Sequence, residues 1–321
     1  MVVCRAPGRQ GIRAVQQGSA GHDRQARDGG RRDDGRAGAH GGGARRAGGG
    51  GSLRGAAGGL RGDRGGQRRP ARRRGAGRRQ RRHRRPPGGG TLPLASTFKL
   101  LAAAAVLARV DAGQDRLDRR IHFGPAELVT YSPLTEPHAG KDGMTLEALC
   151  EAAMILSDNT AGNLLLGSLG GPAGLTAFAR SLGDAETRLD RTEPTLNEAT
   201  PGDPRDTTTP AAMLAGLRAL TLGTALAPAS RERLLGWLRD NRTGDARLRA
   251  GLPAGWRAGE KTGSGEHGTT NDVGLVWPPG EVAGGAPVLV AAYLTGTTAP
   301  AETRNATLAA VARAVAAALS R

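Results

Sequence analysis

Cysteine is scarce in this chain, with only Cys4 and Cys150 among 321 residues. Two cysteines exclude a disulfide framework, and neither lies near histidines or further cysteines at a spacing that suits zinc. The six histidines are scattered along the chain as well. We therefore expect no metal ion and no other cofactor.

Aromatic residues make up 2% of the chain, and none of them lies in residues 1–90. This segment holds 24 arginines and 26 glycines, with no lysine and five acidic residues. It accounts for the net charge of +17, because residues 91–321 hold 22 basic and 24 acidic residues. Without apolar periodicity the segment cannot bury enough surface to offset its chain entropy, so the sequence predicts disorder here.

Three interpretations of residues 1–90 compete. A nucleic-acid-binding arm usually interleaves aromatic residues for base stacking, and a signal peptide or membrane anchor needs an apolar run, which this segment lacks. Arginine, glycine, alanine and proline have G/C-rich codons, so a high-GC gene read out of frame would give the same composition. We favour this third interpretation, and expect no membrane and no nucleic-acid partner.

The remaining residues, 91–321, suit one catalytic domain. A run rich in Leu, Ala and Val extends to residue 110 and is apolar on every side from residue 100 to 107, as in a buried helix. We expect Ser96 to cap this helix or to lie in its first turn. Further helices are predicted after Thr145 and over 160–169, 172–182, 209–222, 229–239 and 301–319. A polar loop at 188–208 is long enough to suggest a function. Short β-rich runs at 256–261, 272–277 and 288–295 suit antiparallel pairing, which together with the helices indicates the α+β class.

Lysine is also scarce: Lys99, Lys141 and Lys261 are the only three among 46 basic residues. An ammonium in apolar surroundings can lose its proton, whereas a guanidinium cannot. The three lysines therefore suggest positions at which a titratable or compact ammonium matters. Lys99 follows Ser96 by three residues, which places both on one face of a helix whose free N–H groups favour negative charge. A plain cap beside a snorkelling lysine would have the same pattern.

Three further stretches add polar groups to this pair. They are Ser157-Asp158-Asn159 at a predicted helix end, Glu193 with Asn197 on the polar loop, and Lys261-Thr262-Gly263-Ser264-Gly265 after a predicted strand. Each stretch is commonplace by itself. Together, in this order and spacing, they resemble the class A serine β-lactamases from Leu92 to about Ser320.

The resemblance implies an antiparallel sheet packed with helices plus an all-helical subdomain, and hydrolysis of the β-lactam amide through a serine acyl-enzyme. Ser96 would attack the lactam carbonyl after Lys99, Glu193 acting through a water, or both remove its proton. The N–H groups of Ser96 and Ser264 would form the oxyanion hole. Ser157 would pass a proton to the departing nitrogen, and Glu193 would then activate the hydrolytic water.

The resemblance also implies a set of substrate-binding residues. The substrate carboxylate would be bound by Lys261, Thr262, Ser264 and Arg247. Asn159 would hold the substrate's side-chain amide, and Asn197 would share a water with Glu193. Tyr131 would wall the entrance, although a packing role would suit it equally.

Two structural details follow from the same resemblance. Arg191 and Asp206 would pair and pin the polar loop shut. Some family members bridge the position of Cys150 to the one that holds Ala103 here, so Cys150 is predicted to be a free, buried thiol.

Residues 1–90 show no counterpart of the family's signal peptide, first helix and first two strands. We therefore expect a sheet that lacks two strands, a bare edge at Val288–Thr295, and a chain that is poorly soluble and weakly active. The family implies a periplasmic or extracellular monomer. Two alternatives stay open: a penicillin-binding D-Ala-D-Ala peptidase, which lacks a Glu193-type loop, and a damaged lactamase with a nucleic-acid-binding N-terminal arm.

Overall fold

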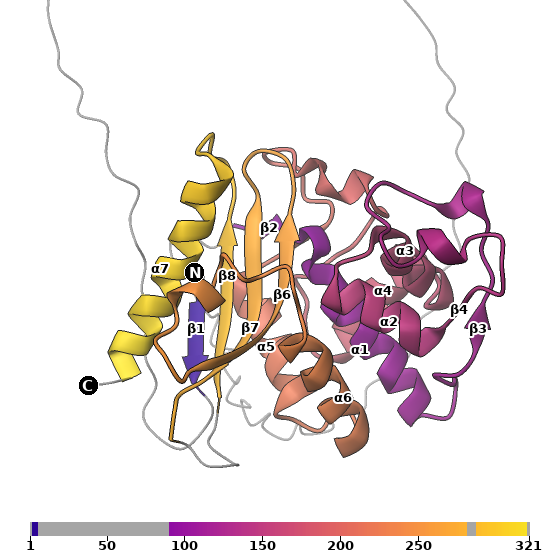
Figure 1. Ribbon diagram of the computed structural model, residues 1–321, viewed down its shortest axis with the longest axis horizontal. Coiled ribbons are helices and arrows are strands. Elements are labelled where there is room, and N and C mark those ends of the chain that lie inside the picture. The colour runs from indigo at the N-terminus through magenta and orange to yellow at the C-terminus, as the bar shows by residue number, and fades with distance from the viewer. Residues whose placement is uncertain (1, 6–89, 281–286, 320–321) are drawn as a thin grey trace, which may run out of the picture. The chain divides into compact units, whose positions relative to one another are not determined.

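Three long strands form the main sheet: β6 (Arg257–Ser264), β7 (Thr270–Trp277) and β8 (Val288–Leu294). The computed structural model describes residues 2–5, 90–280 and 287–319. Neighbouring strands pair antiparallel, with Lys261 opposite Val273 (Figure 1). These are the strands that the sequence predicts, except that β6 continues past Lys261 through the Lys-Thr-Gly stretch.

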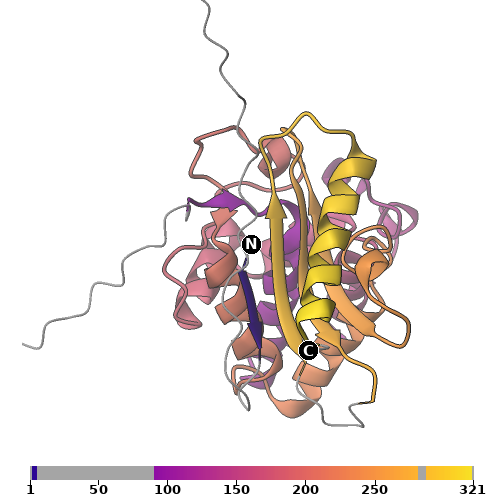
Figure 2. The same ribbon diagram turned by 90° about the vertical axis from the view of Figure 1, so that its left-hand side faces the viewer.

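A fourth strand covers the outer edge of β8. β1 (Val2–Arg5) pairs with it antiparallel, from Val2 opposite Ala291 to Arg5 opposite Val288 (Figure 2). An unpaired edge offers free N–H and C=O groups, which a short β-prone segment can satisfy. The prediction of a bare β8 edge is therefore wrong for Val288–Ala291, and the prediction of disorder throughout residues 1–90 is wrong for residues 2–5. Poor solubility stays a prediction. The other interpretations concern residues 6–89, which lie outside the described residues.

The two faces of this sheet carry separate apolar clusters, because side chains alternate along each strand. Val288 and Val290 of β8 pack with α7 (Ala301–Leu319) on one face. Leu289 and Ala291 face the other side, where α5 (Pro210–Thr221) and α6 (Pro228–Arg239) cover the sheet (Figure 1). The fold is thus α+β, as predicted.

α1 (Phe98–Asp111) lies at the centre of the helical part, and its residues 98–107 are all buried, as its apolar pattern predicts. Three helices surround it: α2 (Leu146–Ile155), α3 (Asn159–Ser168) and α4 (Gly171–Ser181). Thr145 caps α2 by accepting from Ala148 N at 3.1 Å. Cys150 is a free, buried thiol, as predicted.

Several short elements connect these helices and strands, and their length leaves no periodicity for a sequence to reveal. The strands are β2 (Leu92–Pro93) with β5 (Thr207–Thr208), and β3 (Arg120–Ile121) with β4 (Met144–Thr145). The 3-10 turns are η1 (Ala95–Thr97), η2 (Pro125–Glu127), η3 (Glu136–His138), η4 (Thr195–Glu198) and η5 (Arg249–Gly251). None of the described helices combines the length and the apolar character that a membrane crossing requires.

Ser96 does not act as the cap of α1. It lies in η1, while Thr97 occupies the N-cap position without a side-chain capping bond. The Ser96 hydroxyl contacts Lys99 and Glu193 instead. Of the two placements expected for Ser96, the cap is wrong, because its hydroxyl donates to Glu193 of a distant loop and accepts from Lys99. Ser96 lies in the 3-10 turn that leads directly into α1.

Candidate active site

Ser96 lies where the chain turns from η1 into α1. Ala95, directly before it, has φ of +43°, a left-handed conformation that costs a non-glycine residue on the order of 1–3 kcal/mol. Surrounding bonds hold the turn: Leu94 N donates to Asp206 O at 2.8 Å, and Asn271 Nδ2 donates to Leu94 O at 3.2 Å. The strained turn presents Ser96, with 8% of its surface exposed, to a cleft.

Lys99 lies directly beneath this hydroxyl. Its Nζ is 3.0 Å from Ser96 Oγ and 2.9 Å from Glu193 Oε1. It also donates to Asn159 Oδ1 at 2.6 Å and to Ser157 O at 2.7 Å. Complete burial lowers the pKa of the Lys99 ammonium, because desolvation outweighs the opposing attraction of Glu193. A lysine in this state releases a proton more readily than one in water.

Glu193 approaches Ser96 from the loop that the sequence predicts to be functional. Its Oε1 accepts from Ser96 Oγ at 3.0 Å, and its Oε2 accepts from Asn197 Nδ2. Asn163 of α3 holds the backbone of Glu193 on both sides, since Oδ1 accepts from Glu193 N and Nδ2 donates to Glu193 O, both at 2.9 Å. The carboxylate is buried and fixed by both neighbours, unlike a solvated loop acid.

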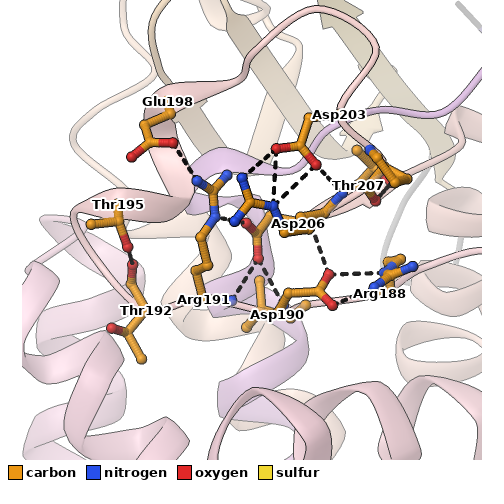
Figure 3. Close-up of polar contacts among 12 residues, drawn as sticks. Arg188, Asp190, Arg191, Thr192, Thr195, Glu198, Asp203, Asp206 and Thr207 are labelled. Atoms are coloured by element: carbon orange, nitrogen blue, oxygen red, sulfur yellow. Dashed lines mark hydrogen bonds and ion pairs between the residues drawn. The ribbon is translucent and has the colours of Figure 1, made fainter.

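The ends of this loop are held together by the ion pair that the resemblance implies. Arg191 Nε donates to Asp206 Oδ2 at 2.6 Å, and the buried Asp206 also accepts from Asp190 N at 2.7 Å (Figure 3). Arg191 reaches Glu198 as well, which adds a second link across the loop (Figure 3). One arginine therefore ties three parts of the loop together and fixes the approach of Glu193.

Ser157 connects the two buried lysines of the site. Its φ of +61° turns its hydroxyl toward the sheet, where Lys261 Nζ donates to Ser157 Oγ at 2.9 Å. Lys99 Nζ lies 3.4 Å from the same oxygen. Burial lowers the pKa of Lys261 well below its ordinary value, and the positive charges of Lys99 and Arg247 lower it further. A proton can thus pass along a short path between ammonium and hydroxyl groups.

Arg247 lies beside the far end of β6. Its Nη2 donates to Ser264 Oγ at 2.6 Å, and its Nη1 donates to Gly263 O at 2.9 Å and to Asn271 O at 2.7 Å. Thr262 is close by, where its hydroxyl contacts that of Thr243. Hydroxyl and guanidinium donors at one end of a cleft suit an anionic group such as a carboxylate.

These residues surround a cleft of about 300 Å³. It brings together most of the predicted site: Ser96, Tyr131, Ser157, Asn159, Asn197, Arg247, Thr262 and Ser264. Lys99, Glu193 and Lys261 complete the set as buried residues in contact with Ser96 or Ser157. Tyr131 is 54% exposed and therefore borders the cleft instead of packing in the core.

Gly263, from one of the stretches singled out in the sequence, shapes the site by its lack of a side chain. A Cβ there would lie 3.0 Å from Leu94 O and 3.2 Å from Ser96 N, so glycine lets β6 approach the nucleophile turn. Gly162 and Asn163 were not singled out. A Cβ on Gly162 would lie 2.8 Å from Lys99 Cε, and this close approach, like the contacts of Asn163, depends on packing between distant segments and leaves no local sequence signal.

No group of three or more His, Cys, Asp or Glu side chains capable of holding a metal ion occurs within the described ranges. The polar groups around the cleft are instead hydroxyls, amides, two ammonium groups, one guanidinium and one carboxylate. This set suits nucleophilic and general acid–base chemistry on an electrophilic carbonyl.

Comparison with known proteins identifies the family of this chain. Residues 88–319 match the model of the family described as the beta-lactamase enzyme family. β-Lactamase OXY-2 of Klebsiella oxytoca is 50% identical over 222 residues, which cover 69% of this chain and 75% of that protein. β-Lactamase AST-1 of Nocardia asteroides is 52% identical over 223 residues, 70% of each chain.

Solved structures give the same result. An ancestral class A β-lactamase (GNCA) aligns with a TM-score of 0.69 and 64% identity, over 71% of this chain and 86% of its own. A putative class A β-lactamase, PenP from Rhodopseudomonas palustris, aligns with a TM-score of 0.69 and 59% identity, over 71% of this chain and 86% of its own. The chain therefore belongs to the class A serine β-lactamases, hydrolases that open the amide of β-lactam antibiotics and thereby give resistance to them.

Proposed function

We propose that Ser96 is the nucleophile and that its proton passes to Glu193, or to Lys99 after Lys99 has given a proton to Glu193. The observation that carries this assignment is the convergence of Lys99 Nζ and Glu193 Oε1 on Ser96 Oγ, each at 3.0 Å. Glu193 Oε1 already accepts from the Ser96 hydroxyl and can take its proton directly as Ser96 Oγ attacks the lactam carbonyl. Lys99 can do the same once it has passed a proton to Glu193, 2.9 Å away, and become a neutral amine.

The oxyanion that forms would be stabilised by the N–H groups of Ser96 and Ser264. Support comes from the close approach of Gly263 to the nucleophile turn, which places the end of β6 against the start of α1. Two preorganised donors of this kind are worth several kcal/mol, since removal of one costs about 3–4 kcal/mol. Gly263 thus acts through the spacing of the two donors.

Ring opening needs a proton on the departing nitrogen. Ser157 Oγ is the proposed donor, because it faces the cleft and accepts from Lys261 Nζ at 2.9 Å. The proton that Ser157 gives up can be replaced from Lys99, whose Nζ lies 3.4 Å from Ser157 Oγ. The lowered pKa of each lysine supports this transfer, since a strongly basic ammonium would retain its proton.

Hydrolysis of the acyl-enzyme requires a second base. Glu193 is the proposed one, acting on a water bound by its carboxylate and also by the Asn197 side chain, whose Nδ2 donates to Glu193 Oε2. This step separates a lactamase from a penicillin-binding D-Ala-D-Ala peptidase, which lacks this loop. Asn163 bonds both the N–H and the C=O of Glu193 and so holds this base in place. A base held in place supports hydrolysis of the acyl-enzyme rather than lasting acylation.

The proposed substrate contacts follow the length of the cleft. The substrate carboxylate would lie against Thr262, Ser264 and Arg247, with the charge of Lys261 behind them. Asn159 Nδ2 donates to Thr130 O at 2.8 Å and has a second hydrogen for a substrate carbonyl. Tyr131, exposed at the entrance, would contact the substrate's side chain.

Mass spectrometry during exposure to benzylpenicillin tests these assignments. The parent protein is expected to show a short-lived adduct, with the mass of the intact penicillin added to the Ser96 peptide. Ser96→Ala is expected to show no adduct and no hydrolysis of a chromogenic cephalosporin. An adduct on another residue, or one lasting hours in the parent protein, would argue against this scheme.

We further propose that the domain works as a monomer in the periplasm or outside the cell. Among the described residues only Tyr131 and Leu134 are large exposed hydrophobic side chains, which supports a monomer. The location is supported only by the family. Light scattering and fractionation of a producing strain would test the two statements.

A further inference from the structure

Two buried carboxyl groups lie next to the strand residues that line the cleft. Glu260 precedes Lys261 in β6, and Asp272 of β7 stands opposite Thr262. Because residues two apart share a strand face, Glu260 and Asp272 project to the same side of the sheet. Both side chains are almost completely buried.

One oxygen of each carboxyl is engaged and the other is not. Glu260 Oε1 accepts from Arg249 Nε at 3.2 Å, and Asp272 Oδ2 accepts from Leu248 N at 3.1 Å. Glu260 Oε2 and Asp272 Oδ1 find no hydrogen-bond donor among the residues that the structure describes. Glu260 and Asp272 are diagonal neighbours on paired strands, a separation that long side chains can span, and both are buried on the same face of the sheet. Two buried carboxylates so placed repel each other, so one proton between them is favoured, and the two unengaged oxygens can share it.

The surrounding charges are compatible with one proton in this pair. The positive charges of Arg249, Arg247 and Lys261 favour the ionised form of the two carboxyls. Asp245, 3.6 Å from Arg249, also attracts the Arg249 guanidinium and so weakens its effect on the pair. Arg304 acts on Arg247 in turn, as a further positive charge on that side. Burial raises the pKa of Glu260 to about 9 and that of Asp272 to about 7 in spite of these cations.

The pair also holds the segment that carries Arg247. Leu248 and Arg249 are each bound to one carboxyl, and they directly follow Arg247. Gly244 packs on the same group, where a Cβ would lie 1.9 Å from Glu260 Oε1. The loop therefore rests on the two acids through both its ends.

We propose that Glu260 and Asp272 share one proton and act as a positioning pair, which holds the 244–249 segment so that Arg247 reaches the substrate carboxylate beside Ser264. The inference rests on the substrate-binding role proposed for Arg247. When hydroxide removes the shared proton, two negative charges meet in a buried site and repel each other. The carboxyls then separate, Leu248 and Arg249 shift with them, and Arg247 loses its alignment with Ser264.

The test compares KM and kcat for benzylpenicillin between pH 7 and pH 10 in the parent protein, Glu260→Gln and Glu260→Ala. Glutamine can donate to Asp272 and accept from Arg249 but has no proton to lose, so KM at high pH should stay low. The parent's KM should rise about tenfold more than that of Glu260→Gln over this range, the factor expected for one charge-assisted hydrogen bond. Glu260→Ala should show the raised KM at every pH, with kcat nearly unchanged.

Controls separate this inference from the role of Arg247. Arg247→Ala should raise KM for benzylpenicillin and abolish the difference between Glu260 and its glutamine variant. The methyl ester of benzylpenicillin has no carboxylate, so parent and Glu260→Gln should process it with the same pH profile. Asp245→Asn, which removes the exposed partner of Arg249, should leave the benzylpenicillin profile unchanged.

Each contrary result has one meaning. If Arg247→Ala left KM unchanged, the proposed role of Arg247 would be wrong. If Arg247→Ala raised KM while Glu260→Gln kept the parent's alkaline rise, only the positioning pair would be overturned. If Glu260→Ala failed to fold, the comparison of KM at high pH between the parent and Glu260→Gln would still test the positioning pair.

Discussion

Lys99 Nζ and Glu193 Oε1 lie 2.9 Å apart, and neither side chain is exposed to solvent. The contact joins α1 to a loop that lies far along the chain, directly under the Ser96 hydroxyl. Removal of one partner of such a pair leaves a buried charge without compensation. A change in the charge of Lys99 or Glu193 should therefore change the stability of the loop that carries Glu193.

Replacement of Glu193 by glutamine should block deacylation more strongly than acylation. The amide keeps the size of the side chain but cannot accept a proton from water, and loss of a general base costs about 10²–10⁴ in rate. The acyl-enzyme on Ser96 should accumulate and be visible by mass spectrometry. Glu302→Gln makes the same change on an exposed residue of α7, outside the site, and as the control should turn over normally. Unchanged hydrolysis by the Glu193 variant would contradict the assignment.

Replacement of Lys99 by arginine should reduce the acylation rate by roughly 100-fold or more. Arginine keeps the positive charge beside Glu193 but does not release its proton at neutral pH. Stopped-flow measurement of acylation by a chromogenic cephalosporin checks this result. Lys141→Arg makes the same change on an exposed residue and should have no effect. A fast Lys99→Arg enzyme would show that charge alone suffices there.

Asp206→Asn should loosen the loop that carries Glu193. The carboxylate is buried and accepts from Arg191 Nε and from two backbone N–H groups, so its loss should cost about 2–3 kcal/mol. Urea unfolding gives the stability, and kcat for benzylpenicillin should fall in parallel. Asp203→Asn, which removes the exposed pair with Arg205, should change neither quantity appreciably. Equal effects of the two variants would count against the special role of Asp206.

Gly263→Ala should impair catalysis more than folding. Its Cβ would push against Leu94 O and Ser96 N, displacing the nucleophile turn, and small misplacements at reacting atoms cost up to about 100-fold in rate. We expect kcat/KM to fall by roughly 10- to 100-fold with a cooperative unfolding transition retained. Gly167→Ala, on an exposed helix position with no neighbour within 4 Å, should leave activity intact and slightly raise stability. Full activity of the Gly263 variant would be inconsistent with the tight approach.

The free energy of unfolding should depend on pH through the ionisation of Glu260. Its pKa rises from the ordinary 4.5 to about 9 on folding, so the folded state binds more protons than the unfolded state between these values. Stability contributed by the neutral acid is thus present below about pH 4.5 and is lost as the pH rises to about 9, by at most ~1.4 kcal/mol per pH unit. The lowered pKa values of Lys99 and Lys261 act in the opposite sense.

A comparison with Glu260→Gln cancels the contribution of the lysines, which both proteins contain, and leaves that of the coupled Glu260–Asp272 pair. Denaturant unfolding at pH 5, 7 and 9 should show the variant gaining stability relative to the parent as the pH rises. A constant difference across this range would mean that Glu260 ionises in the folded protein as it does in water.

The local sequence determined the long helices and strands. The helix at 98–111 is apolar on every side over residues 100–107, and the strand at 288–294 is wholly apolar and includes Val288, Val290 and Tyr293, so burial and β-propensity predict them. Order and spacing of Ser96, Ser157, Glu193 and Lys261 likewise sufficed to predict the family, since chance rarely produces four such motifs in one order.

Only the tertiary structure decided the contacts between segments that are distant in the sequence. The Ser96 hydroxyl bonded to Glu193 instead of capping the helix, β1 paired with the edge of β8, and Glu260 came to lie diagonally across from Asp272 on the paired strands. A local pattern reports propensity and periodicity over one or two turns. Burial, desolvation and the pairing of charges depend instead on which distant segments the fold brings together. The reactive groups of this enzyme lie where such segments are in contact.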